Sequence, residues 1–354
     1  GSSSKLKQGG PLPAGASAGA GDGSASKSVA SPPAVAALDV AMTFDRRLAV
    51  GTAKGEVYVT DPMATPPHPV TPPRLTRLTT GHSRSVAGLA PHPKLPGVYA
   101  TAGEDKLLAI WDARERSLVR HTHLPVPGRS VAFSPDGKLI AVGMMKGALA
   151  VLDAAKLRVL KVMRHCAEDL ADVKFSPDGS KLAVGSHDNY IDVYDIKDKV
   201  IKRRGRCIGH TSYITHIDWS KDSRLLQSNC GAYEILYWDA STCKQLRSST
   251  DDVESNTLWS TYTCVLGFPV MGIWPPFSDG TDVNALQRSR DGRFLVTADD
   301  FGGIKIFNSP CIVDNAPHRR YKGHSAHVMN VRFTTNQEHV ISVGGGDKVN
   351  ASMH

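Results

Sequence analysis

Four side chains between residues 82 and 111 have types that could carry out chemistry together, namely His82, Thr101, Asp105 and Trp111. A hydroxyl, an imidazole and a carboxylate form the triad of nucleophilic hydrolases, in which the imidazole takes the proton of the hydroxyl and the carboxylate orients the imidazole. The same types also form a buried hydrogen-bonded set, in which the histidine bridges the aspartate and the hydroxyl, and the hydroxyl meets the indole N–H. Recurrence along the chain distinguishes the catalytic role from the structural one, because a catalytic set does not repeat in every structural unit.

A Gly-His pair recurs at His82, His210 and His324, and a Trp-Asp pair closes the first two of these units at Trp111-Asp112 and Trp238-Asp239. The separation from histidine to tryptophan is 29 positions in the first unit and 28 in the second. This opening, closing and spacing are typical of a four-stranded propeller blade. We therefore predict that the four side chains form a structural tetrad, and that the chain has no catalytic residues.

Weaker copies of the unit keep a regular period. Their last strands end at Asp61, Asp112, Asp153, Asp195, Asp239 and Asn308, in steps of 51, 41, 42, 44 and 69 residues. Three of these steps match the usual period of about 40–45 residues. The sequence therefore predicts an all-β fold, a WD40-type β-propeller of about seven four-stranded blades over residues 35–354. The last blade should be incomplete, because the unit that opens at Gly323-His324 shows no closing strand, and we expect residues near 35–41 to pair there.

Two units depart from the tetrad pattern. Ala232 stands where the second complete unit should have its aspartate, so His210 must find another partner or water. In the last unit we place Val343 at the position of the hydroxyl residue. Both blades should therefore be less rigid at that edge.

Composition limits the class of protein. The chain has 354 residues and is 41% hydrophobic, which is enough for a large buried core, and no apolar run approaches the roughly 18–20 residues of a membrane span. Residues 1–34 are rich in Gly, Ser, Ala and Pro, so we expect a disordered linker. The six cysteines form no C-x-x-C pair, which is typical of reduced thiols in a cytosolic protein.

The chain is basic, with a formal net charge of +8 and a pI near 9.1. Such a charge suits an acidic partner, although a solvated surface with a modest excess of Lys and Arg explains it equally well. Basic clusters that include Arg203, Arg204, Arg319 and Arg320 are predicted to lie in linkers between blades. The sequence contains neither H-E-x-x-H nor a phosphate-binding loop, so we expect no metal and no cofactor.

An apolar insertion, residues 258–277, accounts for the 69-residue step. It contains Trp259, Tyr262, Phe268 and Trp274. A solvated loop would not carry so much apolar area, since burial contributes about 25 cal/mol per Å². The insertion either packs on its own propeller or forms a contact surface for another domain or protein. Its four aromatic residues and the four arginines are our candidate partner surface.

Several segments of the second half resemble the echinoderm microtubule-associated protein-like family. The resemblance covers roughly residues 35–347 and is more specific than the blade period. The segments that carry it are residues 213–219, 233–238, 259–274, 278–285, 299–302 and 323–328. The sequence is most similar to the second of the paired propellers of the long, multi-module members.

The resemblance implies a function. A member of this family would be a non-enzymatic scaffold or interaction module that binds tubulin or microtubules. Its partners would also include the neighbouring propeller of the same polypeptide, and would not include nucleic acid or membrane. The implied location is the cytoplasm and cytoskeleton, with the cilium or flagellum among the candidates. The blades alone also fit a generic WD-repeat adaptor in a different protein assembly.

Overall fold

The computed structural model describes most of the chain after residue 36, with short gaps. The described residues are 37–42, 48–52, 57–60, 76–79, 81–197, 200–247, 253, 256–275, 278–279, 282–345 and 352–353. The predicted linker 1–34 lies outside them. Within them no helix is long and apolar enough to cross a membrane.

The described strands form seven antiparallel sheets, six with four strands and one with three, and each sheet is built from consecutive strands. The first sheet consists of β1 (Ala37–Met42), β2 (Leu48–Thr52), β3 (Val57–Thr60) and β4 (Thr76–Thr79). The second consists of β5 (Val86–Pro91), β6 (Val98–Gly103), β7 (Leu107–Asp112) and β8 (Ser117–His123). The third consists of β9 (Gly128–Phe133), β10 (Leu139–Met144), β11 (Ala148–Asp153) and β12 (Val159–Arg164).

The second half of the chain repeats this order. The fourth sheet consists of β13 (Leu170–Phe175), β14 (Lys181–Ser186), β15 (Tyr190–Lys197) and β16 (Val200–Ile208). The fifth consists of β17 (Ile214–Trp219), β18 (Leu225–Cys230), β19 (Ile235–Asp239) and β20 (Lys244–Gln245). The sixth consists of β21 (Val283–Arg288), β22 (Phe294–Asp299), β23 (Gly303–Asn308) and β24 (His318–Lys322), and the last of β25 (Val328–Phe333), β26 (Val340–Gly344) and β27 (Ser352–Met353).

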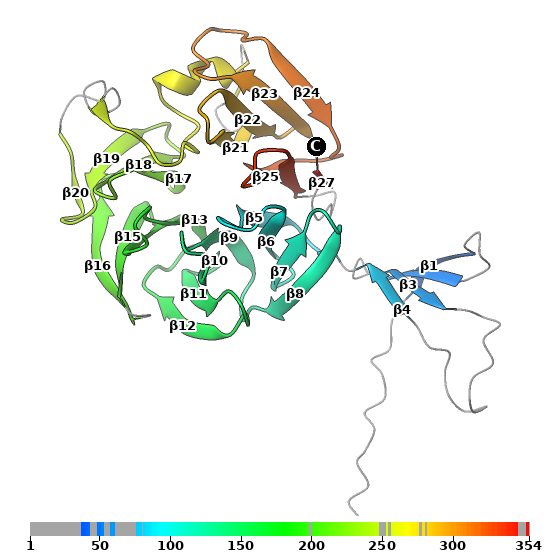
Figure 1. The fold of residues 1–354 in the computed structure, drawn as a ribbon. Helices are drawn as coiled ribbons and strands as arrows, with labels where there is room; N and C mark the ends of the chain where they lie inside the picture. Colours follow the sequence, from blue (N-terminus) through cyan, green and yellow to red (C-terminus); the bar gives the residue numbers. More distant parts are fainter. Residues whose placement is uncertain are drawn as a thin grey trace, which may run out of the picture. The chain divides into compact units, whose positions relative to one another are not determined.

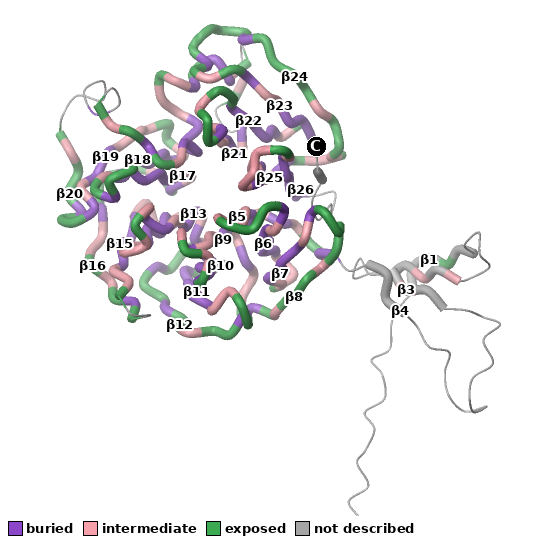
Figure 2. The backbone as a smooth tube through the Cα atoms, in the orientation of Figure 1, coloured by how far each residue is buried: buried purple, intermediate pink, exposed green. Residues whose placement is uncertain are grey.

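Burial follows the position of a strand within its sheet. Every residue of β10 is buried, whereas the outer strand β12 of the same sheet is mostly exposed. The inner strands are apolar on both faces because sheets pack against both of them, which is why they read as continuous Val, Ile, Leu and Ala. Figure 2 shows the same gradient, from purple inner strands to green outer ones.

The hairpins inside the sheets are closed by turns that the sequence specifies. In one of them the Ser134 hydroxyl donates to Asp136 Oδ1 at 2.6 Å, and Gly137 adopts a positive φ of 76°. That backbone conformation is the one that glycine adopts without steric cost. These local turns set the register of the strands on either side.

Six of the sheets, from β5–β8 to β25–β27, surround a common centre (Figure 1). The last sheet contacts the β5–β8 sheet directly, since Asn330 Nδ2 donates to the Ala87 carbonyl at 2.9 Å. Ile341 and Val343 also share a buried cluster with Val86 and Leu89. The all-β propeller predicted from the sequence is therefore confirmed.

In the described part of the chain the last sheet has three strands where the other six have four, so an incomplete last blade is confirmed, whereas the expected lack of any closing strand is wrong. Its third strand, β27, is only two residues long and pairs with β26 through Ile341 opposite Met353 and Ser342 opposite Ser352. The expectation that residues near 35–41 pair with this blade is wrong for the described residues, because β1 pairs with β2 instead. Of the strands that the structure describes, β1 is the edge strand of the first sheet, and β27 has β26 as its one neighbour.

Candidate functional site

The tetrad residues meet in the β5–β8 blade. His82 Nδ1 lies 3.0 Å from both carboxylate oxygens of Asp105, and His82 Nε2 lies 2.7 Å from Thr101 Oγ1. Trp111 Nε1 donates to the same hydroxyl oxygen at 2.7 Å. Asp105 also accepts hydrogen bonds from the backbone N–H of Ser83 and Leu107. The set therefore connects the loop before β5 with β6, β7 and the turn between them.

Burial decides what this set can do. Thr101 is fully buried and His82 is 1% exposed, so a substrate cannot reach the hydroxyl. Burial by itself raises the pKa of Asp105, but hydrogen bonds from His82, Ser83 and Leu107 lower it overall. The carboxylate therefore stays ionised and holds the imidazole in place. This geometry supports a structural role for the tetrad and not a catalytic one.

The β17–β20 blade uses a glutamate that the sequence analysis missed. His210 Nε2 lies 2.6 Å from Ser228 Oγ, and Trp238 Nε1 donates to that oxygen at 2.8 Å. The remaining ring nitrogen, Nδ1, lies 3.2 Å from Glu234 Oε2. Glu234 comes two positions after Ala232, and its longer side chain spans the difference. In the sequence, an acidic residue two positions after Ala232 was the signal that could have identified Glu234 as the partner of His210.

The last blade also retains its hydroxyl, so the prediction that Val343 replaces it was wrong by one position. His324 Nε2 lies 2.8 Å from Ser342 Oγ, and Ser342 is fully buried. Adjacent residues of a strand point to opposite faces, so a shift of one residue exchanges the two environments. Val343 accordingly packs in the apolar cluster that joins the last blade to the β5–β8 blade.

The insertion packs between the β17–β20 and β21–β24 blades and includes the 3₁₀ helix η1 (Phe268–Ile273). Trp259 and Tyr262 are 4% and 2% exposed, and Trp259 stacks on Tyr237 with a centroid distance of 5.9 Å. The half-buried Trp274 donates its indole N–H to the Val265 carbonyl at 3.1 Å. These three aromatic residues therefore support the first of the two interpretations, in which the insertion packs on the propeller of its own chain.

A buried carboxylate fastens the insertion to the ring. Asp218 on β17 accepts hydrogen bonds from the Thr261 hydroxyl at 2.6 Å and from the backbone N–H groups of Thr263 and Cys264 at 2.7 and 2.9 Å. Lys174 Nζ on the neighbouring blade lies 3.3 Å from it. Burial raises the pKa of Asp218, but Lys174 and these hydrogen bonds hold it well below its usual range.

Part of the insertion remains exposed. Phe268 is 64% exposed and Met271 45%, and both belong to η1. Ile312 and Val313 are 38% and 65% exposed. The two segments lie side by side, since the backbone N–H of Gly272 donates to the Cys311 carbonyl at 2.8 Å. We call Phe268, Met271, Ile312 and Val313 the η1 patch.

The four arginines lie on outer strands and not in linkers, which corrects their predicted position. Arg203 and Arg204 are on β16, where Arg203 pairs with Asp192 at 2.8 Å and Arg204 with Asp195 at 2.7 Å. Arg319 and Arg320 are exposed on β24. Among the described residues neither of these two has an ion-pair partner. The basic side chains of β24 are therefore the more available for an acidic partner.

The centre of the ring contains a cavity of about 270 Å³ that is lined by both polar and apolar side chains. Its lining includes Arg129, Asp172, His187, His216 and Arg332. Burial lowers the pKa of His216 to about 4, and it also lowers the pKa of His187 and of Arg332. Both histidines are therefore neutral at neutral pH, and the arginines supply the positive charge of the cavity.

All six cysteines lie in the described part of the chain and are buried free thiols, as the absence of a C-x-x-C pair suggested. Cys166 lies between β12 and β13, Cys207 on β16, Cys230 on β18 and Cys243 between β19 and β20. Cys264 lies in the insertion, and Cys311 follows β23. One of them, Cys230, contacts the carboxylate that holds His210, since its Sγ lies 3.1 Å from Glu234 Oε2.

Comparison with known proteins identifies the family. The family model for the echinoderm microtubule-associated protein second beta-propeller matches residues 86–351. Echinoderm microtubule-associated protein-like 2 of Rattus norvegicus is 44% identical over 272 residues, which are 76% of this chain and 41% of that protein. Echinoderm microtubule-associated protein-like 3 of Homo sapiens is 44% identical over 270 residues, 75% of this chain and 30% of that protein.

A third relative agrees with the first two. Echinoderm microtubule-associated protein-like 1 of Mus musculus is 45% identical over 276 residues, 77% of this chain and 33% of that protein. The matched part thus spans less than half the length of each of these relatives. The match nevertheless covers the strands from β5 to β26, the insertion, and every tetrad residue described above except His82. The chain therefore belongs to the echinoderm microtubule-associated protein family and carries its second β-propeller.

Proposed function

We propose that this propeller is a non-enzymatic interaction module of the microtubule cytoskeleton, which binds tubulin or microtubules as part of a longer protein. The observation that carries the proposal is the family match over residues 86–351. The burial of Thr101 and His82 supports a scaffold and not an enzyme. On this proposal the protein works in the cytoplasm on the cytoskeleton, without nucleic acid or membrane as a partner.

The exposed face of β24 is our candidate for the contact with tubulin. Arg319 and Arg320 extend from an outer strand that has no further strand beside it within the sheet. A basic strand edge attracts an acidic surface, and the net charge of +8 adds to that attraction at long range. Arg203 and Arg204 contribute less, because neighbouring aspartates already neutralise them.

The η1 patch is our candidate for the contact with the neighbouring propeller of the same polypeptide. Two of its exposed apolar side chains, Phe268 and Met271, belong to the insertion, and the other two, Ile312 and Val313, lie beside it in the segment after β23. Large apolar side chains gathered on a surface favour association, because contact removes their area from water. Phe268 is the member of the predicted aromatic set that remains accessible for this role.

Co-sedimentation with polymerised microtubules, at two salt concentrations, tests the proposal. We expect the purified chain to pellet with microtubules at low salt and less so at high salt, since exposed charges are screened. The double variant Arg319→Glu, Arg320→Glu should pellet less than the wild type. A matched control, Arg114→Glu and Arg116→Glu, makes the same charge change at exposed positions between β7 and β8.

The outcomes separate the candidates. Equal loss in both double variants would mean that net charge alone governs binding, and would remove β24 as the contact. No co-sedimentation of the wild type at any salt concentration would favour the alternative, a generic WD-repeat adaptor in a different assembly.

For the η1 patch, Phe268→Ser should weaken the binding of a separately produced first propeller without lowering the melting temperature.

A further inference from the structure

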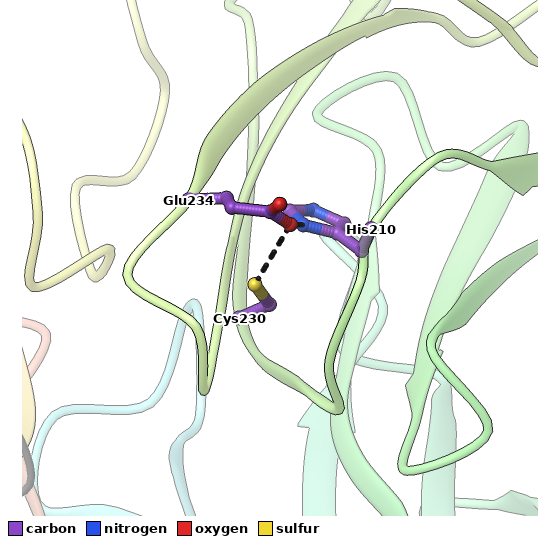
Figure 3. Close-up of side chains that lie close together, drawn as sticks. All are labelled: His210, Cys230 and Glu234. Carbon is purple, nitrogen blue, oxygen red and sulfur yellow. Dashed lines mark hydrogen bonds and ion pairs between the residues drawn. The ribbon is translucent and has the colours of Figure 1, made fainter.

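A thiol lies against the histidine–carboxylate pair of the β17–β20 blade. Glu234 Oε2 is 3.2 Å from His210 Nδ1 and 3.1 Å from Cys230 Sγ. The three candidate ligand atoms all lie within 4.8 Å of one another. Figure 3 shows the three side chains close together, and they come from the loop before β17, the end of β18 and the residue directly before β19.

The tetrad itself does not need this thiol. Thr101 and Ser228 hold equivalent positions, because each meets a histidine Nε2 and accepts a tryptophan N–H. Two residues later the β5–β8 blade has Gly103 where the β17–β20 blade has Cys230. A Cβ atom at Gly103 would lie 2.8 Å from His82 Nδ1, so a side chain at this position points at the histidine.

The β17–β20 blade makes room for that side chain by changing the source of the carboxylate. Glu234 reaches the histidine from two positions further along than Asp105 does, while both turns keep a residue with positive φ at the same place, Lys106 at 65° and Tyr233 at 61°. The two turns have the same length, so the later position of Glu234 on its turn is what brings its carboxylate into contact with both His210 Nδ1 and Cys230 Sγ.

From this arrangement we propose that His210, Cys230 and Glu234 form a zinc-binding site, in which a water molecule completes the coordination. Thiolate, imidazole and carboxylate are the three ligand types that Zn²⁺ takes in proteins, at about 2.0–2.3 Å. A tetrahedral ion of that size needs ligand atoms about 3.3–3.8 Å apart, so small side-chain shifts from the present separations suffice. The spacing of these ligands along the chain matches no metal motif, which is why the sequence analysis predicted none.

The groups around the three ligands already have the positions that a metal site requires. The backbone N–H of Thr211 holds Glu234 Oε2 at 3.0 Å, and its hydroxyl holds Oε1 at 2.8 Å. With a metal on Nδ1, the imidazole proton moves to Nε2 and is donated to Ser228 Oγ, which can donate in turn to the Leu236 carbonyl. Such outer hydrogen bonds orient metal ligands in proteins.

Access and solvent exposure fit the same assignment. His210 and Cys230 are buried, whereas the side chain of Glu234 is 29% exposed, which leaves one side of the site open for a water ligand. Cys230 also lines the central cavity of about 270 Å³, which offers a path for the ion. Bound zinc would join the loop before β17 to the β18–β19 hairpin and so stiffen this blade.

Cobalt titration of the purified full-length chain tests the site, because a thiolate bound to Co²⁺ absorbs strongly in the near ultraviolet. We expect one such band per chain, displaced by one equivalent of Zn²⁺. The variant Cys230→Ser should lose the band and bind Zn²⁺ at least about tenfold more weakly, since even outer-shell changes cost about 10–100-fold. Glu234→Gln should weaken zinc binding by a similar factor while retaining the thiol.

Two controls make the result specific. Cys311→Ser removes another buried thiol that is remote from these ligands and should leave the band and the affinity unchanged. His121→Gln with His123→Gln removes an exposed histidine pair on β8 that could hold metal adventitiously, and it should not affect the band. Zinc should raise the melting temperature of the wild type and not that of Cys230→Ser.

Several results would overturn the proposal. It fails if the wild type shows no thiolate band, if the band persists in Cys230→Ser, or if Cys311→Ser loses it equally. It also fails if zinc binding depends on the β8 histidine pair and not on Cys230. If Cys230→Ser does not fold, Glu234→Gln decides, because unchanged zinc affinity in that variant would exclude the carboxylate and with it the site.

Discussion

Replacing Asp218 by asparagine should loosen the attachment of the insertion. The two carboxylate oxygens face donors only. Oδ1 accepts from the Thr261 hydroxyl at 2.6 Å, and Oδ2 accepts from the backbone N–H groups of Thr263 and Cys264 at 2.7 and 2.9 Å. An amide has one oxygen, so its NH₂ group must face donors in either orientation. The substitution keeps the shape of the side chain and removes its charge and half of its acceptors.

The magnitude follows from the surroundings of the lost charge. Asp218 is fully buried, and Lys174, whose side chain is only 13% exposed, lies 3.3 Å from it. Removing one partner of a buried ion pair costs about 3–5 kcal/mol, because the other charge stays buried. Asp172 also lies 3.3 Å from Lys174 and remains as a second partner. We therefore expect the free energy of unfolding to fall by about 3 kcal/mol, the lower end of that range.

Urea unfolding followed by tryptophan fluorescence measures this loss, and hydrogen exchange shows whether residues 259–275 open first. Asp222→Asn is the matched control, since Asp222 is an exposed aspartate of the same blade that accepts hydrogen bonds from Ser220 and Arg224. It should cost less than about 1 kcal/mol. The reasoning is refuted if Asp218→Asn unfolds within about 1 kcal/mol of the wild type, or no more easily than the control.

Three further predictions concern the tetrad, the insertion and acid stability. Asp105→Ala should lower the free energy of unfolding by about 1–3 kcal/mol by leaving His82 Nδ1 without its carboxylate, and a variant that melts normally but loses partner binding would contradict that role. Trp259→Ser should cost about 3–5 kcal/mol, whereas Phe268→Ser should stay within about 0.5 kcal/mol of the wild type, and equal thermal shifts would disprove the assigned burial. The folded pKa of His216 is about 4 against 6.5 when unfolded, so only the unfolded state binds its proton between these values. Between pH 6.5 and about 4, stability should then fall by about 1.4 kcal/mol for each pH unit, and an unchanged slope in His216→Gln would exclude this histidine as the cause.

The repeat pattern by itself determined the blades and the first tetrad. His82, Thr101, Asp105 and Trp111 lie within 30 positions of one another, inside a single sheet of consecutive antiparallel strands. Hairpins of this kind are local, so the spacing along the chain translates directly into the spacing of side chains in the blade. The same locality explains why the last blade could be predicted to be smaller than the others, although its two-residue third strand β27 was missed.

Only the tertiary structure decided which side chains complete the sites between segments. Glu234 replaces the missing aspartate because its longer side chain reaches His210 Nδ1 from a position two residues further along the turn, and the repeat pattern does not report that substitution. Asp218 holds residues 43–46 positions away, and the aromatic residues of the insertion divide into the buried Trp259 and the exposed Phe268. A composition rich in apolar side chains predicts that an insertion is packed somewhere, but burial of each side chain depends on the shape of the space between two blades. That space exists only once the ring has closed, which is why the period along the chain could not specify it.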